Sequence, residues 1–138
     1  MAFEYGLLGR SGGATPSEAL NNLLEALGSG TPKVTHGEVK QGEGWASSRI
    51  SFRGSDGSST EQNIQVSVGG KIVDIFLRKA RAVLADDLLT GRDLMLVISI
   101  SGPMDVAVND RVVGFAQQRW QGIPWDEISG FLTSFDRP

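Results

Sequence analysis

The stretch WASSRISFRGSDGSSTEQNIQVSV, residues 45–68, contains two runs in which apolar and polar side chains alternate. In the first run, the even positions from Ala46 to Phe52 face one way and the odd positions face the other. In the second run, Ile64, Val66 and Val68 alternate with polar residues. Such alternation is typical of a strand with one buried face. Because the linking segment 54–59 is rich in glycine and serine, the stretch predicts an antiparallel hairpin with a loose tip.

Downstream of the hairpin, the spacing of apolar residues changes from two to three and four. This spacing runs from Ile72 to Leu88 and predicts an amphipathic helix near residues 71–89, ended by Gly91. A competing interpretation is that residues 70–77 continue the strand and that the helix begins only near Arg78.

The last third of the chain carries three further patterns. Residues 94–101 are almost continuously apolar, which predicts a strand covered on both faces. Asn109-Asp110 separates two β-branched runs, so residues 104–108 and 111–117 are predicted to form a hairpin. A final helix is predicted from Pro124, with an apolar face formed by Trp125, Ile128, Leu132 and Phe135.

Upstream of the hairpin lies the strongest helix signal in the sequence. Thr15, Pro16 and Glu18 have the spacing of a capping box with proline at the first helical position. Leucines at spacing three and four follow, and Gly28 supplies a stop, so residues 16–27 are predicted to be helical. Residues 2–8 are apolar enough for a first strand, and the polar stretch around residues 34–39 is assigned one more.

The predicted order of elements is therefore β-α-βββ-α-βββ-α. Runs of strands joined by short turns favour an α+β fold with a mainly antiparallel sheet of about five or six strands and two to three helices. A chain of 138 residues fits one domain, so residues 1–138 are assigned to a single domain.

The composition excludes several kinds of chemistry. The chain has no cysteine and one histidine, His36, so it contains no thiolate nucleophile, disulfide or cysteine-based zinc site. Glycine is abundant, with 18 residues, but the loop at residues 9–13 lacks the second glycine and the lysine of a phosphate-binding loop. We therefore predict no cofactor, no metal and no enzymatic activity, while a carboxylate pair assembled by the fold is left open.

The charge balance is mildly acidic. Lys and Arg number 13 against 16 Asp and Glu, which gives a net charge of −3, and the pI is near 5.1. This balance argues against a dedicated nucleic-acid binder. The longest apolar run, residues 94–98, is too short for a membrane span, and the amino terminus lacks a signal-peptide pattern, so a cytoplasmic protein without a membrane partner is expected.

One segment near the carboxyl end predicts a binding surface. Two of the three tryptophans fall in a polar, turn-like stretch, and tryptophan and arginine are enriched in binding hot spots. The predicted partner-binding residues are Arg119, Trp120, Gln121 and Trp125. The alternative is that both tryptophans fold back on the sheet, with Trp125 in the apolar face of the last helix.

These features favour a non-catalytic protein-interaction domain, namely an inhibitor, an immunity protein or an accessory protein. Its acidic balance suits a more basic partner protein such as a toxin, because complementary charge speeds association. One alternative is a self-assembling subunit of a phage or secretion system, pairing through an edge near residues 112–115 or through the tip at 54–59. Another is a small enzyme in which Arg49 and Arg53, on one strand face, clamp an anion.

Overall fold

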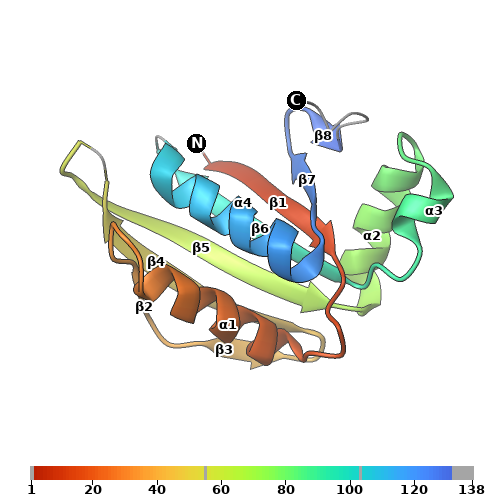
Figure 1. Ribbon diagram of the computed structural model, residues 1–138, viewed down its shortest axis with the longest axis horizontal. Helices are drawn as coiled ribbons and strands as arrows, with labels where there is room; N and C mark the ends of the chain where they lie inside the picture. Colours follow the sequence, from red (N-terminus) through yellow and green to blue (C-terminus); the bar gives the residue numbers. More distant parts are fainter. Residues whose placement is uncertain (1, 55, 103, 132–138) are drawn as a thin grey trace.

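The computed structural model describes residues 2–54, 56–102 and 104–131. These residues form eight strands and four helices in an α+β arrangement around one sheet (Figure 1). The strands are β1 (Ala2–Gly9), β2 (Thr35–His36), β3 (Lys40–Gly42), β4 (Trp45–Arg53), β5 (Ser59–Val68), β6 (Leu94–Ser101), β7 (Ile123–Asp126) and β8 (Gly130–Phe131). The helices are α1 (Pro16–Gly28), α2 (Gly70–Arg81), α3 (Asp86–Leu89) and α4 (Val106–Trp120).

The predicted hairpin forms the centre of the fold. Strands β4 and β5 pair antiparallel along their full length, from Trp45 opposite Ser67 to Arg53 opposite Ser59. The order of strands across the sheet is β2-β4-β5-β6-β1-β7-β8, and β3 also pairs with β4. Each of these pairs is antiparallel, which confirms the predicted character of the sheet.

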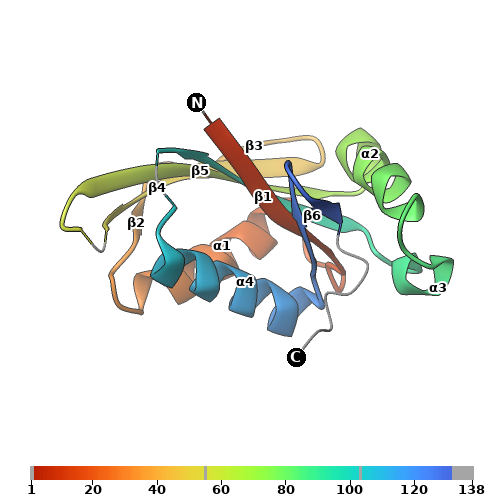
Figure 2. The same cartoon turned by 90° about the horizontal axis from the view of Figure 1, so that it is seen from above.

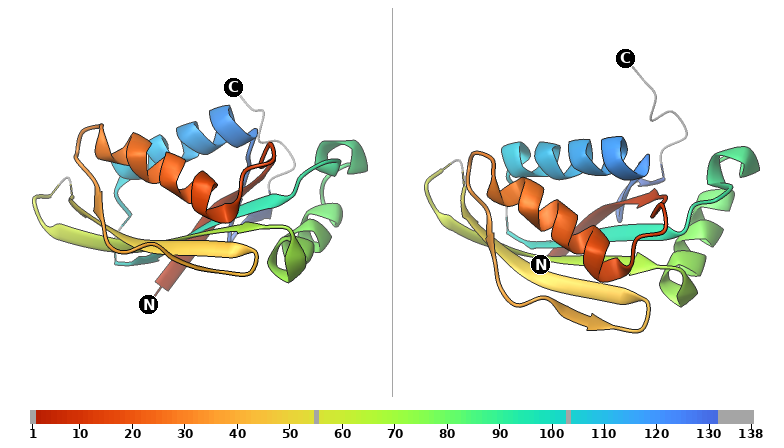
Figure 3. Two further views of the ribbon diagram at one scale, coloured as in Figure 1. Left: turned by 90° about the horizontal axis from the view of Figure 1, so that it is seen from below. Right: turned by 60° about the horizontal axis from the view of Figure 1, so that its bottom comes forward.

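Helices α1 and α4 cover one face of the sheet (Figures 2 and 3). The predicted capping box is present, because Glu18 N–H donates to Thr15 Oγ1 at 3.1 Å and Thr15 N–H donates to Glu18 Oε1 at 2.9 Å. Strand β6 sends its even-numbered residues, including Leu96 and Ile98, into the core beneath these helices. The four leucines of α1 pack into the same core, so the helix predicted at residues 16–27 is confirmed.

A second, smaller core lies on the other face, at one end of the sheet. Val73 and Ala80 of α2 are buried there with Met95 of β6. The Phe76 ring packs edge-on against Trp125 of β7, with 4.8 Å between the ring centroids. Because α2 covers only this end, part of the sheet face opposite α1 and α4 is left open (Figure 2).

The long helix predicted at residues 71–89 is divided in two. Residues 70–77 are helical, so the interpretation that they continue the strand is wrong. The chain becomes extended at Ala85, between α2 and α3. In an unbroken helix, Leu84 and Leu89 would point in different directions, since five residues correspond to about 500° of rotation. The break lets both side chains reach the second core.

The hairpin predicted at residues 104–117 is wrong, because α4 spans this region. Asp105 caps the helix by accepting the Val108 N–H at 3.1 Å. Residues at a spacing of four, namely Val108, Val112, Ala116 and Trp120, are buried against the sheet. Four valines give this segment the composition of a strand, but the burial of Val108 and Val112 against the sheet outweighs that weak preference. Residues 112–115 are accordingly helical and are not a sheet edge.

The helix predicted from Pro124 is also wrong. The chain instead forms β7, whose Ile123 and Trp125 are buried, and then turns back into β8. The Asp126 side chain stabilises the turn by accepting the N–H groups of Ile128 and Ser129 at 2.9 and 2.7 Å. Ile128 is 81% exposed, while Leu132 and Phe135 lie outside the described residues.

The element counts therefore exceed the predicted ones. Eight strands and four helices stand where five or six strands and two to three helices are predicted. Strands β2, β3 and β8 contain only two or three residues each. Strands this short are not recognisable from an alternation of apolar and polar residues.

Candidate functional site: an acidic recess beside the sheet

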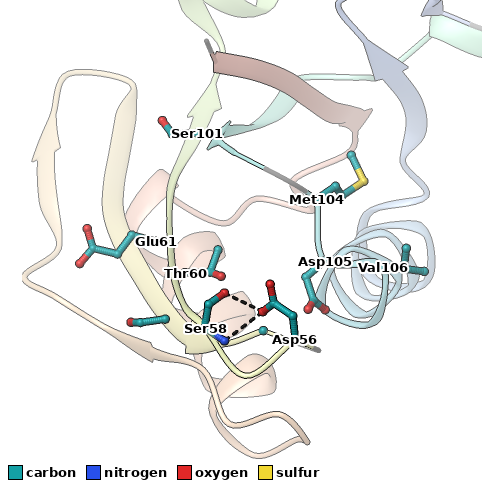
Figure 4. Close-up of a pocket in the computed structure, with 10 residues that line it drawn as sticks. Asp56, Ser58, Thr60, Glu61, Ser101, Met104, Asp105 and Val106 are labelled. Carbon is teal, nitrogen blue, oxygen red and sulfur yellow. Dashed lines mark hydrogen bonds between the residues drawn. The ribbon is translucent and has the colours of Figure 1, made fainter.

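A recess of about 400 Å³ lies between the β4–β5 hairpin tip and the start of α4 (Figure 4). Its walls come from segments far apart in the sequence, which the fold brings together at one end of the molecule. The described residues that line it are Gly54, Asp56, Ser58, Ser59, Thr60, Glu61, Ser101, Met104, Asp105 and Val106.

Three side-chain oxygens converge beside Gly54. A Cβ atom at this position would lie 3.2 Å from Thr60 Oγ1, 3.3 Å from Asp56 Oδ1 and 3.5 Å from Asp105 Oδ2. Figure 4 shows both carboxylates on the same side of the recess. Glycine at residue 54 keeps this space free of a side chain.

Asp56 is held in place within the hairpin tip. Its Oδ1 accepts the Ser58 N–H at 2.9 Å and the Ser58 hydroxyl at 2.6 Å. These two hydrogen bonds stabilise the charged form, so the pKa of Asp56 lies below its usual value. The carboxylate is therefore ionised at neutral pH while its side chain is exposed.

Asp105 is fixed by its position at the start of α4. Its side chain is 8% exposed, Oδ1 accepts the Val108 N–H, and Oδ2 lies near Gly54. A carboxylate is favoured at a helix amino terminus because backbone N–H groups point toward it. The position of this oxygen is consequently set by the fold rather than by a flexible side chain.

The rim of the recess mixes charge with apolar surface. Glu61 pairs with Arg49 at 3.3 Å across the open face, and both side chains are more than half exposed. Met104 and Val106 are 40% and 65% exposed on the α4 side. The recess thus combines two fixed carboxylates, hydroxyl groups and an apolar lip.

This arrangement suits binding of a cationic group. Ionised carboxylates and hydroxyl oxygens accept hydrogen bonds from guanidinium and ammonium groups. The single histidine, His36, lies on β2, and its Nδ1 contacts the Gly37 carbonyl oxygen at 2.7 Å. Among the described residues, no group of three or more histidine, cysteine or acidic side chains is placed to hold a metal ion.

The two arginines predicted to clamp an anion are engaged elsewhere. Arg49 pairs with Glu61, and Arg53 donates to the Gly57 carbonyl oxygen at 2.7 Å. Both belong to β4 on the open face, as expected. Arg49 thus forms the kind of cross-strand ion pair that is common on a solvent-exposed sheet face, and Arg53 stabilises the hairpin tip.

The predicted partner-binding residues do not form one surface patch. Trp120 is 3% exposed and packs edge-on against Phe115 in the core beneath α1 and α4. Trp125 is 8% exposed and belongs to the second core, on the opposite face of the sheet. Both rings thus fold back on the sheet, as the alternative interpretation expects, although Trp125 lies on a strand and not on a helix.

The other two predicted residues lie at the surface. Arg119 is exposed, with its guanidinium 5.9 Å from the centre of the Phe115 ring. Gln121 ends α4 in a left-handed conformation, with φ of 55°, and its side chain accepts a hydrogen bond from Arg10. Arg92 donates to the Gln121 carbonyl oxygen, and Arg10 also donates to the Thr90 carbonyl oxygen at 3.1 Å. Gln121 therefore links the end of α4 to the segments that contain Arg10 and Arg92. A binding role for these residues stays a prediction.

No pattern in the sequence predicts the acidic recess. Residues 54–59 are readable only as a loose tip, and Asp105 falls within the strand predicted at residues 104–108. A signal existed in the capping position of Asp105, but it becomes readable only once the following valines are assigned to a helix. The pairing of Asp56 with Asp105 is a product of the tertiary fold.

A surface of opposite charge lies at the other end of the sheet (Figure 1). Helix α2 carries Lys71, Arg78, Lys79 and Arg81 against the single acid Asp74. Ile72 and Ile75 of the same helix are 40% and 43% exposed. The helix thus presents a cationic and partly apolar surface on a chain whose net charge is −3.

Comparisons with known proteins add no relative. Neither the models of protein families nor the curated proteins nor the solved structures contain a significant match to this chain. None of the helices formed by the described residues is long and apolar enough to cross a membrane.

Proposed function

We propose that this protein is a non-catalytic protein-binding domain that acts as an inhibitor, immunity protein or accessory protein. In this proposal, a basic side chain of the partner enters the acidic recess. The observation that carries it is the convergence of Asp56 Oδ1, Thr60 Oγ1 and Asp105 Oδ2 on the space beside Gly54.

The geometry favours an arginine side chain of the partner. A guanidinium group has five N–H donors in a fixed plane and forms charge-assisted hydrogen bonds that are roughly twice as strong as neutral ones. Its aliphatic stem would lie against Met104 and Val106, which are exposed at the rim. Because Asp105 is already held by the helix start, binding of a partner would cost little side-chain entropy on this wall of the recess.

Affinity capture from lysate of the native cell tests the proposal. The bait proteins are the wild type, Asp56→Asn and the control Asp74→Asn, which removes an exposed acid from α2 at the far end of the molecule. A partner with a basic surface, retained by wild type and control but reduced at least tenfold by Asp56→Asn, supports the proposal. A monomer that captures nothing, or a partner retained equally by all three baits, contradicts it.

The charge distribution favours self-association as a second candidate function. The cationic surface of α2 and the acidic recess lie at opposite ends of the sheet, so two copies can meet head to tail. Light scattering over a range of protein concentrations tests this arrangement. We expect the measured mass to increase with protein concentration at low salt. In about 0.5 M salt the mass should fall, because salt screens the attraction between surface charges. A monomer at every concentration rejects it.

A further inference from the structure

A second cavity, of about 170 Å³, lies between α4, β1 and the β7–β8 turn. It opens on the side of α4 away from α1, and Met104 lines both this cavity and the acidic recess. The side chains that shape it include Phe3, Tyr5, Asn109, Val113 and Pro124. Its lining is therefore mostly apolar and aromatic.

Two polar atoms of lining residues have no hydrogen-bond partner within the described part of the chain. These are the hydroxyl oxygen of Tyr5, whose side chain is 6% exposed, and Oδ1 of Asn109. Buried polar atoms without partners are rare in proteins, because the loss of hydration is then not compensated. Two such atoms beside one cavity offer hydrogen-bonding capacity that a ligand in the cavity would use.

We propose that this cavity binds a neutral phenol-sized group, an aromatic ring that carries one hydroxyl. The ring would contact Phe3, Val113 and Pro124, and its hydroxyl would supply the hydrogen-bonding group that Tyr5 and Asn109 lack. Cavities of about 150 Å³ with apolar linings accept benzene-sized molecules, so the volume fits. The proposal concerns a different site from the recess and does not depend on it.

The charges near the cavity select for a neutral ligand. Burial raises the pKa of Tyr5 well above its usual value, and the negative charge of Asp110 raises it further. The Tyr5 hydroxyl therefore stays protonated and acts as a donor. Asp126 also lines the cavity, so an anionic ligand such as a carboxylate would be repelled.

Titration of the ¹⁵N-labelled protein with p-cresol, toluene and benzoate tests the proposal by NMR. We expect p-cresol to shift the amide signals of Gly6 and Gly130, with at least tenfold weaker binding of toluene and benzoate. The absence of shifts with p-cresol at millimolar concentration overturns the proposal. Equal binding of toluene and p-cresol also overturns it, since the hydroxyl would then contribute nothing.

Two variants separate the polar contacts from the packing. Tyr5→Phe removes only the hydroxyl and is expected to weaken p-cresol binding about tenfold while leaving toluene binding unchanged. Asn109→Ala is compared with Gln118→Ala, which removes an exposed amide from the same helix. If Gln118→Ala weakens p-cresol binding as much as Asn109→Ala does, the assignment of Asn109 is wrong.

A third ligand distinguishes the two sources of a phenol group. N-acetyl-tyrosine amide carries the same ring on a peptide backbone. Binding of both this compound and p-cresol assigns the cavity to a tyrosine side chain of a partner protein. Binding of p-cresol alone assigns it to a free small molecule, and binding of neither overturns the proposal.

Discussion

At the scale of single residues, Gly54 and Tyr5 illustrate two ways in which a fold creates binding capacity. Gly54 leaves a space that three oxygens surround, where any side chain would intrude. Tyr5 places a hydroxyl in a buried position without giving it a partner among the described residues. The two proposed binding sites rest on these two arrangements.

The Tyr5 hydroxyl gives a direct stability test. Replacing a buried, unsatisfied donor by an apolar atom of similar shape is close to neutral or stabilising, by about 1 kcal/mol. We therefore expect Tyr5→Phe to leave unchanged or raise the free energy of unfolding of the ligand-free protein, measured by urea denaturation. A loss of more than about 1 kcal/mol would show that the hydroxyl already has a hydrogen-bond partner.

The cap residue Asp105 gives a second test at the same scale. Asp105→Ala removes the acceptor for the Val108 N–H, and loss of an N-cap costs about 1 kcal/mol. Hydrogen exchange should become faster at the first turn of α4 and stay unchanged in α1. Uniform destabilisation of both helices would contradict the assigned capping function.

At the scale of elements, α4 shows why a sequence pattern can predict strands where the structure forms a helix. Helix α1 and the β4–β5 hairpin were predictable because local signals, a capping box and a strict alternation, agree with the final packing. In α4 the valines favour strand locally, while their spacing of four satisfies the sheet face that they cover. Tertiary burial decided the outcome, and the sequence alone contains no measure of it.

The candidate site was less predictable than the fold for a related reason. Asp56 belongs to a turn and Asp105 to a helix cap, and each has a local explanation that makes no reference to the other. Their convergence depends on the register of β5 against β6 and on the position of α4. Conversely, the aromatic segment looked functional because tryptophans in a polar stretch resemble a hot spot, whereas both rings pack into cores.

Gly114 tests the assignment of residues 106–120 to a helix. This glycine lies in α4, is exposed, and has open space around its Cβ position. Gly114→Ala should stabilise the protein by about 0.5–1 kcal/mol, because alanine is the better helix former. Gly114→Val should stabilise less than alanine does, and thermal unfolding would measure the difference. The reverse order would favour the strand that the sequence pattern predicts.

At the scale of the whole molecule, charge is distributed unevenly along the sheet. The cationic helix α2 lies at one end and the acidic recess at the other, so a net charge of −3 understates the local fields. A basic partner would be steered to the recess end, since complementary potentials raise association rates.

The recess should also confer a pH dependence on binding. The pKa of Asp56 lies below its usual value because Ser58 donates two hydrogen bonds to the carboxylate. A cation requires the ionised form, so the contribution of Asp56 to affinity should be constant above the ordinary aspartate pKa of about 3.9 and fall as the pH drops through the lower pKa of Asp56. Loss of binding between roughly pH 6 and 7 would indicate a group other than Asp56.

The most direct test of the acidic recess is an NMR titration with N-acetyl-arginine amide, set against its neutral analogue N-acetyl-citrulline amide. The predicted result is a set of saturable shifts at the amides of Gly54, Asp56, Ser58, Thr60 and Asp105 with the arginine compound. Citrulline, and arginine added to Asp56→Asn, should give at least tenfold weaker binding. Shifts of equal size with both compounds, or shifts that fall outside the recess, would contradict the proposal that it binds a basic side chain.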